Sequence, residues 1–197
     1  MKTISKKDKR KLAQADYLRL NGKDWLNDKI LNAVFECINE YTGKCPLVQE
    51  TYLASKILHK KTLAKSHVKI WQKIFFEANR FTILPINLHN LHWLLAYIQP
   101  RGKSDITCSL LDSMESGNTD EVAERLRKSF DTFVKETDSA SNIKIKFQPS
   151  IQQFSTFACG DSTISNALAL AMGHKNIISE KSSLRKQLAD LLSAEDE

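Results

Sequence analysis

The sequence contains few of the residues that mark specialised classes of protein. Among its 197 residues are only 6 glycines, 4 prolines and 4 cysteines, which excludes a collagen-like repeat and a proline-rich disordered chain. It lacks any run near the ~18 consecutive apolar residues of a membrane span, and no apolar stretch follows the basic N-terminus as in a signal peptide. With 42% hydrophobic and 26% charged residues, the composition predicts one globular domain that works inside a cell, in the cytosol or nucleus.

The net charge of +6 is concentrated at the N-terminus. The first eleven residues contain six Lys or Arg and one Asp, so this segment carries +5 and the rest of the chain only +1. This distribution argues against nucleic acid as a partner, because nucleic-acid binding needs basic residues gathered on one folded surface. We expect a basic arm at residues 1–12, acting as a nuclear address, a contact for an acidic partner or a solvated segment, and a single domain at 13–197.

The cysteines do not form a metal-binding or disulfide pattern. No C-x-x-C pair occurs, and the five histidines are not spaced as metal ligands relative to the cysteines. The sequence therefore predicts neither a metal site nor a disulfide framework, and we expect no cofactor. A buried thiol is the default interpretation for each of Cys37, Cys45, Cys108 and Cys159.

Hydrophobic spacing predicts an α+β protein with a central, mainly antiparallel sheet flanked by helices. Helices are expected from Leu26 to just before Gly43, once or twice within 51–78, and at Asp120–Thr137, Thr163–Met172 and Leu184–Leu192. Strands are expected at Phe81–Leu88, Trp93–Gln99, Ile106–Leu111 and Ile143–Phe147. Asn118 or Thr119 is available near the start of the second long helix. Residues 12–23 are interpreted as an approach to the domain that ends in a turn at Asn21-Gly22.

Cys159 precedes an apolar helix, and this position distinguishes it from the other cysteines. Backbone N–H groups and the helix dipole at a helix N-terminus favour a thiolate over a thiol. Cys37 lies inside a predicted helix, Cys108 inside a strand and Cys45 beside a proline, settings that do not lower the pKa of a thiol. Cys159 is therefore the candidate nucleophile, with an inert core thiol as the alternative.

His92 and Asp112 are candidates for the groups that assist a thiol nucleophile. Such chemistry needs an imidazole to exchange protons and a third group to hold that imidazole in one orientation. His92 begins one predicted strand and Asp112 ends the next, so a hairpin would bring them to one edge of the sheet. The alternative is a strand-end histidine with a turn-forming aspartate, and His89 is the substitute base.

Gln152 and Gln153 lie in the loop upstream of Cys159. The attacked carbonyl becomes an oxyanion, which needs donors such as a side-chain amide and the backbone N–H of the nucleophile. Either glutamine could supply that amide, or it could simply be solvated.

Several short motifs follow one another in a specific order. Trp25-Leu26-Asn27-Asp28 opens a helix, Leu84-Pro85-Ile86-Asn87 leads to His92-Trp93, Leu111-Asp112-Ser113-Met114 follows, and Gln152-Gln153 precedes Cys159-Gly160. Together, from about residue 15 to 175, they resemble the SENP/ULP family of clan CE cysteine proteases, which act on SUMO, NEDD8 or ubiquitin. The resemblance implies a papain-like (SENP/ULP-type) fold and a thiol isopeptidase or protease without a cofactor.

The resemblance also implies a role for each matching residue. His92 would be the general base, Asp112 its orienting partner, Cys159 the nucleophile and Gln153 the oxyanion-hole amide. Trp25 and Trp93 would form a narrow tunnel for the substrate's C-terminal Gly-Gly, because any Cβ would collide with the rings; both indoles could instead be core residues. Asp28 would contact a basic residue near the tail of the modifier.

Two departures from the family pattern leave alternatives open. Ala158 stands where family members usually carry Asp, so the loop before Cys159 is held differently or the chain is a non-cleaving module that binds ubiquitin-like proteins. The segment before Leu84, where the family recognises its modifier, shows no clear match, which weakly favours ubiquitin or NEDD8 over SUMO. Some clan CE relatives are protein acetyltransferases. We expect a monomer that binds a ubiquitin-like protein and no membrane, located in a host cytosol if it is a secreted bacterial effector.

Overall fold

The computed structural model describes residues 12–43, 47–59, 65–72, 81–101, 105–114, 118–137, 142–150, 152–153, 155–173 and 181–193. Of the predicted basic arm only Leu12 is described, and Cys45 also lies outside these ranges. The domain boundary at residue 13 stays a prediction.

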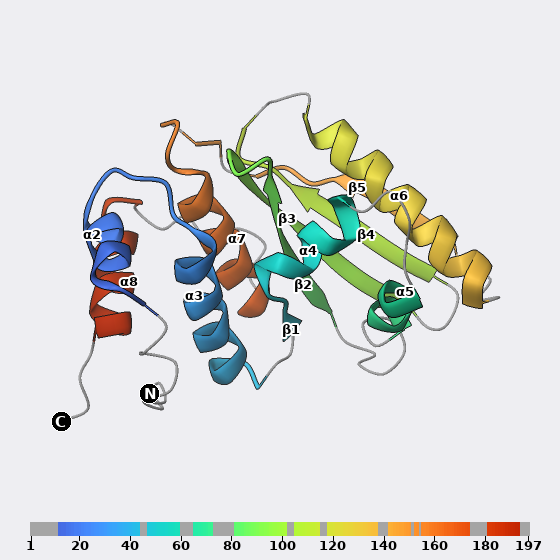
Figure 1. Ribbon diagram of the computed structural model, residues 1–197, viewed down its shortest axis with the longest axis horizontal. Helices are drawn as coiled ribbons and strands as arrows, with labels where there is room; N and C mark the ends of the chain where they lie inside the picture. The colour runs from blue at the N-terminus through green and yellow to red at the C-terminus, as the bar shows by residue number, and fades with distance from the viewer. Residues whose placement is uncertain are drawn as a thin grey trace.

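Helices and strands alternate along the chain in the order expected of an α+β protein (Figure 1). The helices are α2 (Gln14–Asn21), α3 (Asp28–Tyr41), α4 (Thr51–His59), α5 (Lys65–Gln72), α6 (Asn118–Thr137), α7 (Cys159–Ala171) and α8 (Lys181–Ser193). The strands are β1 (Leu47–Val48), β2 (Thr82–Leu88), β3 (His92–Arg101), β4 (Asp105–Leu111) and β5 (Asn142–Phe147). Every element predicted from hydrophobic spacing is confirmed, with bounds that differ by a few residues.

The five strands form one sheet in the order β1-β2-β3-β4-β5. β2, β3 and β4 are antiparallel neighbours over long registers, as predicted. The outer strands instead join in parallel, β1 beside β2 and β5 beside β4. Parallel neighbours require a crossover connection, which α4 and α5 supply between β1 and β2, and α6 supplies between β4 and β5.

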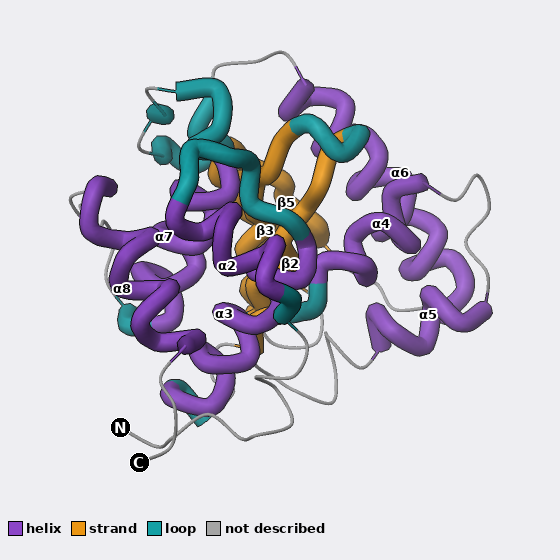
Figure 2. The backbone as a smooth tube through the Cα atoms, turned by 60° about the vertical axis from the view of Figure 1, so that its left-hand side comes forward, coloured by secondary structure: helices purple, strands orange, loops and turns teal. Residues whose placement is uncertain are grey.

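Helices cover both faces of the sheet (Figure 2). On one face, Leu84, Leu94 and Ala96 pack with side chains of α4, α5 and α6, and on the other face Ile83 and Leu95 pack with α3, α7 and α8. Successive residues of β2 and β3 thus pack alternately into the two cores, one on each face of the sheet. Because both faces are buried, these strands have almost continuous apolar sequences rather than alternation of apolar and polar residues.

Two elements were not predicted. β1 is only two residues long, too short to give a periodic signal. Residues 12–23 were interpreted as an approach, which is wrong, because α2 occupies Gln14–Asn21 and packs beside α8 (Figure 1). Its hydrophobic periodicity is weak, and the helix depends on the Asp16 carboxylate, which accepts a hydrogen bond from the Ala13 N–H at 2.9 Å, and on the burial of Leu20.

The helix that begins at the candidate nucleophile starts earlier than predicted. Hydrophobic spacing placed its start at Thr163, whereas α7 starts at Cys159. The small and polar residues of its first turn, including Asp161 and Ser162, are buried, so tertiary packing rather than apolar periodicity sets this end. Of the helices in the described residues, none is long and apolar enough to span a membrane.

Candidate active site

The β3–β4 hairpin brings His92 and Asp112 together at one end of the sheet. His92 is the first residue of β3, and Leu95 pairs with Leu111, so Asp112 follows β4 at the same end. The Nε2 atom of His92 lies 2.7 Å from Oδ1 of Asp112. The two side chains are only 8% and 7% exposed, so solvent does not compete effectively for this hydrogen bond.

Asp112 is oriented by two further donors. The backbone N–H of Met114 donates to Oδ1 at 2.9 Å, and the Thr119 hydroxyl donates to Oδ2 at 2.7 Å. Thr119 was expected only to help start a helix, and its role as a partner of Asp112 was not predicted. Burial raises the pKa of Asp112, but the hydrogen bonds from His92, Thr119 and Met114 outweigh burial and leave that pKa below its ordinary value.

Cys159 occupies the first position of α7 and is 2% exposed. Cys159 lies near enough to His92 to raise the pKa of the imidazole, as Asp112 does. Because Nε2 faces the carboxylate, Nδ1 is the ring nitrogen left for the sulfur. The sequence-predicted nucleophile, base and orienting carboxylate therefore lie together, although they come from a helix, a strand and the end of another strand.

The pKa of His92 reflects these two neighbours. Burial by itself lowers the pKa of an imidazole, but the hydrogen bonds and negative charges of Asp112 and Cys159 act in the opposite direction and raise it from 6.5 to about 9. The imidazole is therefore charged at neutral pH when the sulfur is a thiolate. An imidazolium beside a thiolate can protonate a departing amine.

The other described cysteines do not have a comparable setting. Cys108 is fully buried, and burial raises its pKa to about 12. Cys37 is half-buried within α3 and donates to the Ala33 carbonyl at 3.2 Å. Cys45 lies outside the described residues. Within the described part of the chain, Cys159 is distinguished from Cys37 and Cys108 by its effect on a histidine, whose pKa it raises.

His89, the substitute base, lies in the turn between β2 and β3. It is exposed and has a positive φ of 54°, as does Asn90 at 60°. Leu91 donates its N–H to the Leu88 carbonyl at 2.8 Å, which closes this turn. The geometry favours His92 over His89, since it is His92 that lies between a carboxylate and a sulfur.

The two loop glutamines differ in how firmly they are held. Gln153 is half-buried: its N–H donates to the Ser113 carbonyl at 2.7 Å, its Oε1 accepts from the Ser113 hydroxyl at 2.8 Å, and its Nε2 donates to the Ser155 carbonyl at 2.9 Å. Gln152 is exposed, and its Nε2 makes two longer contacts of 3.3 Å. Gln153 is thus attached both to the segment after Asp112 and to the loop before Cys159.

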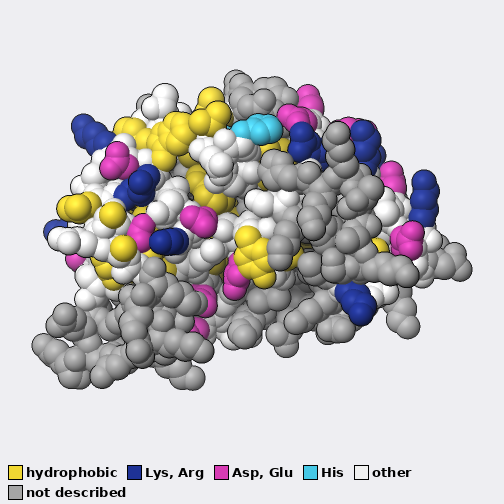
Figure 3. Space-filling view, in the orientation of Figure 1, with side chains coloured by type: hydrophobic (Ala, Val, Ile, Leu, Met, Phe, Trp, Pro, Cys, Tyr) yellow, Lys and Arg dark blue, Asp and Glu magenta, His cyan; other side chains and the backbone are white. Residues whose placement is uncertain are grey.

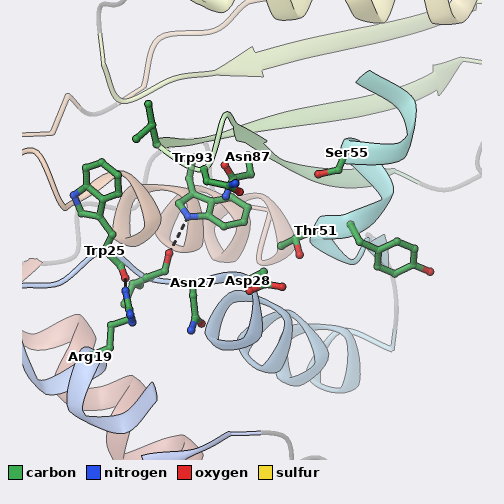
Figure 4. A pocket seen from close by; sticks show the side chains of 12 residues that line it. Arg19, Trp25, Asn27, Asp28, Thr51, Ser55, Asn87 and Trp93 are labelled. Atoms are coloured by element: carbon green, nitrogen blue, oxygen red, sulfur yellow. Dashed lines mark hydrogen bonds between the residues drawn. The ribbon is translucent and has the colours of Figure 1, made fainter. Parts of the chain in front are cut away.

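A cavity of about 350 Å³ contains the three predicted substrate-binding residues (Figure 4). Trp25, Trp93 and Asp28 all line it. Asp28 and Thr51, the first residues of α3 and α4, border the cavity from the helix side. Sequence reasoning missed Arg19, Thr51, Asn87 and Leu91 as lining residues. Asn87 belongs to a motif that the sequence analysis singled out, but only the tertiary structure brings it to the cavity beside Arg19 and Thr51.

The two tryptophans differ in burial. Trp93 is 4% exposed, belongs to the core between the sheet and α7, and donates its Nε1–H to the Leu26 carbonyl at 2.9 Å. Trp25 is 37% exposed. Trp93 is therefore a core residue, as the alternative interpretation expected, and it also lines the cavity.

In Figure 3, hydrophobic side chains gather at the upper edge of the molecule, over the start of α7 and the turn between β2 and β3.

A close packing contact fixes the start of α7 against the segment that contains Trp25. A Cβ placed on Gly160 would lie 2.9 Å from the Cβ of Leu26, closer than side-chain atoms approach each other. Glycine at position 160 therefore lets the first turn of α7 reach Leu26. Because Leu26 also accepts the Trp93 hydrogen bond, it connects the start of α7 to the cavity wall.

Among the described residues, no group of three or more His, Cys, Asp or Glu side chains is arranged to hold a metal ion.

Comparisons with known proteins agree with this architecture. Residues 24–196 match the family model of the Ulp1 protease family, C-terminal catalytic domain. No curated protein sequence matches the chain.

Solved structures with the same fold include three informative examples. One is the SUMO protease Ulp1 with its catalytic cysteine oxidized to a sulfenic acid, at 18% identity and a TM-score of 0.73, covering 96% of this chain and 94% of that one. A second, with the same identity and TM-score and coverage of 96% and 95%, is the Ulp1 protease domain in complex with Smt3, the yeast ortholog of SUMO. The third is the Xanthomonas campestris effector XopD bound to ubiquitin, at 18% identity and a TM-score of 0.63, covering 86% and 92%. At these identities the likeness demonstrates the shared fold.

Proposed function

Because the chain belongs to the Ulp1 protease family, we propose that this cysteine protease cleaves after the C-terminal Gly-Gly of ubiquitin or a ubiquitin-like modifier. The observation that carries the proposal is the position of His92 between Asp112 and Cys159, beside a cavity lined by two indoles. A nucleophile, a base and a confined approach are the three parts that such a reaction needs.

In the acylation step, the Cys159 thiolate attacks the carbonyl carbon of the terminal glycine and forms a C–S bond. The protonated His92 gives its proton to the departing nitrogen as the C–N bond breaks, which releases the lysine side chain as a neutral amine and leaves a thioester. Asp112 does not accept this proton. Its hydrogen bond keeps the imidazole ring oriented and stabilises its positive charge.

In the deacylation step, His92 takes a proton from a water molecule as that water attacks the thioester carbonyl. The C–S bond breaks, the modifier leaves as a carboxylic acid that releases its remaining proton to solvent, and the Cys159 thiolate is restored beside the imidazolium. The same sequence hydrolyses a peptide bond in a modifier precursor. The proposed activity therefore includes both maturation of precursors and removal of modifiers from lysines.

Both steps pass through a tetrahedral intermediate with a negatively charged oxygen. We assign the side-chain amide of Gln153 and the backbone N–H of Cys159 as its donors. Gln153 is held by Ser113 and Ser155, which supports a fixed amide, and N–H groups in the first turn of a helix have no partner within that helix. Donors that are fixed before the reaction stabilise charge most effectively.

The cavity residues account for the selection of Gly-Gly. A chain that passes between Trp25 and Trp93 meets flat rings, so residues without a Cβ enter most easily. Asp28 lines the same cavity and is proposed to contact a basic residue near the modifier's tail. The solved complexes of fold relatives contain Smt3 or ubiquitin, so ubiquitin, NEDD8 and SUMO are the modifiers to compare.

The direct test uses ubiquitin, NEDD8 and SUMO that end in a propargyl group. The wild-type protein should form a covalent adduct with at least one of them, and Cys159→Ala should form none. Cys37→Ala is the matched control and should react as the wild type does. Absence of every adduct, together with acetyl transfer from acetyl-CoA to a protein substrate, would replace the proposal with an acetyltransferase. Stable binding of a modifier without an adduct would replace it with a binding module.

A further inference from the structure

A buried ion pair connects the nucleophile helix to the C-terminal helix. Nε of Arg185 on α8 lies 2.8 Å from Oδ1 of Asp161, and Nη2 lies 2.8 Å from Oδ2. The two side chains are 12% and 6% exposed. Asp161 is the third residue of α7, two positions after Cys159. A two-pronged contact between planar groups fixes orientation as well as distance.

The remaining donors of Arg185 contact backbone carbonyls of two further segments, the loop before Cys159 and the end of α2. Nη2 donates to the Phe157 carbonyl at 3.4 Å, and the guanidinium lies 5.4 Å from the centre of the Phe157 ring. Nη1 donates to the carbonyls of Gly22 at 2.9 Å and Arg19 at 3.3 Å. One guanidinium group thus holds the loop before the nucleophile and the end of α2.

The α2 end leads directly to the cavity. Arg19 lines the cavity, and its own Nη1 donates to the Trp25 carbonyl at 2.9 Å. α2 and α8 lie side by side (Figure 1), so Arg185 reaches the end of α2 from the neighbouring helix. Ala158, between Phe157 and Cys159, has no polar side chain with which to hold this loop. The hydrogen bond from Arg185 to the Phe157 carbonyl instead holds the loop from outside.

Building on the proposed function, we propose that Arg185 is a positioning residue that holds the cavity wall bearing Trp25 in register with the start of α7, which bears Cys159. A modifier tail bound at the cavity wall is then presented to the sulfur at the start of α7. Arg185 does not touch the substrate. A displacement of about 1 Å between a bound substrate and its nucleophile reduces the rate by about 100-fold.

The test compares two reagents on three variants. Iodoacetamide requires only a reactive Cys159, whereas a propargyl-terminated modifier requires Cys159 and the Trp25 wall in register. Arg185→Met combined with Asp161→Asn removes both charges, so no unpaired buried charge remains. Arg185→Lys keeps a charge for Asp161, and Lys186→Met is the control because Lys186 is exposed at the next position on α8.

The double variant should react with iodoacetamide within about 3-fold of wild type but with the modifier probe about 10- to 100-fold more slowly, as expected for lost alignment. Arg185→Lys should fall between the double variant and wild type, and Lys186→Met should match wild type. Equal losses with both reagents, or wild-type rates with both in a folded double variant, would overturn the proposal.

Hydrogen–deuterium exchange tests the same idea without a substrate. In the double variant, backbone amides of 19–25 and of 155–161 should both exchange faster, and those of β2 and β3 should not. Faster exchange in only one of the two segments, or in neither, would show that Arg185 does not couple them. A wild-type protein that reacts with no modifier probe contradicts the proposed function, whereas the exchange result judges the role of Arg185 independently.

Discussion

Two tryptophans on opposite faces of the sheet show how differently the faces are used. Trp71 is 0% exposed, its ring centre lies 4.8 Å from that of Phe130, and its Nε1–H donates to the Ser129 hydroxyl at 3.0 Å. Trp93 is 4% exposed and also makes a hydrogen bond, to Leu26, but it lines a cavity. Similar burial thus serves packing on one face and a binding wall on the other, and the adjacent cavity makes the difference.

The helices that cover the two faces differ in the kind of side chain that they bury. α6 presents an apolar stripe to the sheet, including Phe130 and Phe133, both 0% exposed. α7 buries polar side chains in its first turns, among them Asp161, Ser162, Thr163 and Ser165. Buried polar groups cost stability unless they are paired, so the first turns of α7 carry a cost that the apolar stripe of α6 largely avoids. Substitutions on the two faces should therefore have separable effects.

The largest expected effect is a loss of enzymatic activity when Asp112 is substituted. Asp112→Asn should lower kcat/KM by about 10⁴-fold, because the amide cannot stabilise the imidazolium and favours the wrong tautomer. Steady-state cleavage of a modifier fused to a fluorescent leaving group measures the loss, and circular dichroism should show an unchanged fold. Asp131→Asn, at an exposed position of α6, is the control. A variant with full turnover would remove Asp112 from the mechanism.

The second-largest expected effect is a loss of stability on the face of the sheet that α6 covers. Phe130→Ala should lower the free energy of unfolding by about 3–5 kcal/mol, because it removes a fully buried ring beside Trp71 and leaves a cavity. Urea denaturation measures this loss. The folded fraction should retain its kcat/KM, since Phe130 belongs neither to the cavity nor to the group formed by His92, Asp112 and Cys159. A large fall in kcat/KM of the folded variant would show that the two faces are not independent.

The smallest effect is a dependence of stability on pH that originates at the active site. The pKa of His92 rises from 6.5 to about 9 on folding, so the stability it contributes is fully present below pH 6.5 and is lost as pH rises through 9. The loss is at most about 3.5 kcal/mol, because one pKa unit corresponds to about 1.4 kcal/mol. Urea denaturation of wild type and His92→Gln at pH 6 and pH 9.5 measures it.

Removal of the Cys159 side chain provides the control for this pH dependence. Cys159→Ala removes one of the two groups that raise the pKa of His92, so its alkaline loss of stability should be smaller than that of wild type. Phe130→Ala should shift the stability at both pH values by the same amount. A wild-type protein that is equally stable at pH 6 and pH 9.5 would contradict the raised pKa.

The site could be predicted from the sequence to the extent that its residues occupy the ends of regular elements. His92 begins β3 and Asp112 follows β4, so an antiparallel register was sufficient to bring them together. The role of Thr119 could not be predicted, because its hydroxyl reaches Asp112 across a loop. The cavity residues Thr51 and Asn87 were likewise missed, since their proximity depends on how α4 packs against β2.

The sequence alone determined the order of the elements, the antiparallel centre of the sheet and the family resemblance, because apolar periodicity and short motifs are local properties of the chain. Tertiary structure decided the early start of α7, the helical state of α2 and the contacts of Arg185. Each of these depends on groups far apart in the chain: Gly160 against Leu26, α2 against α8, and one guanidinium shared by residues up to 166 positions away. Such contacts leave no periodic trace in the sequence, since the free energy that favours them arises only when the helices pack.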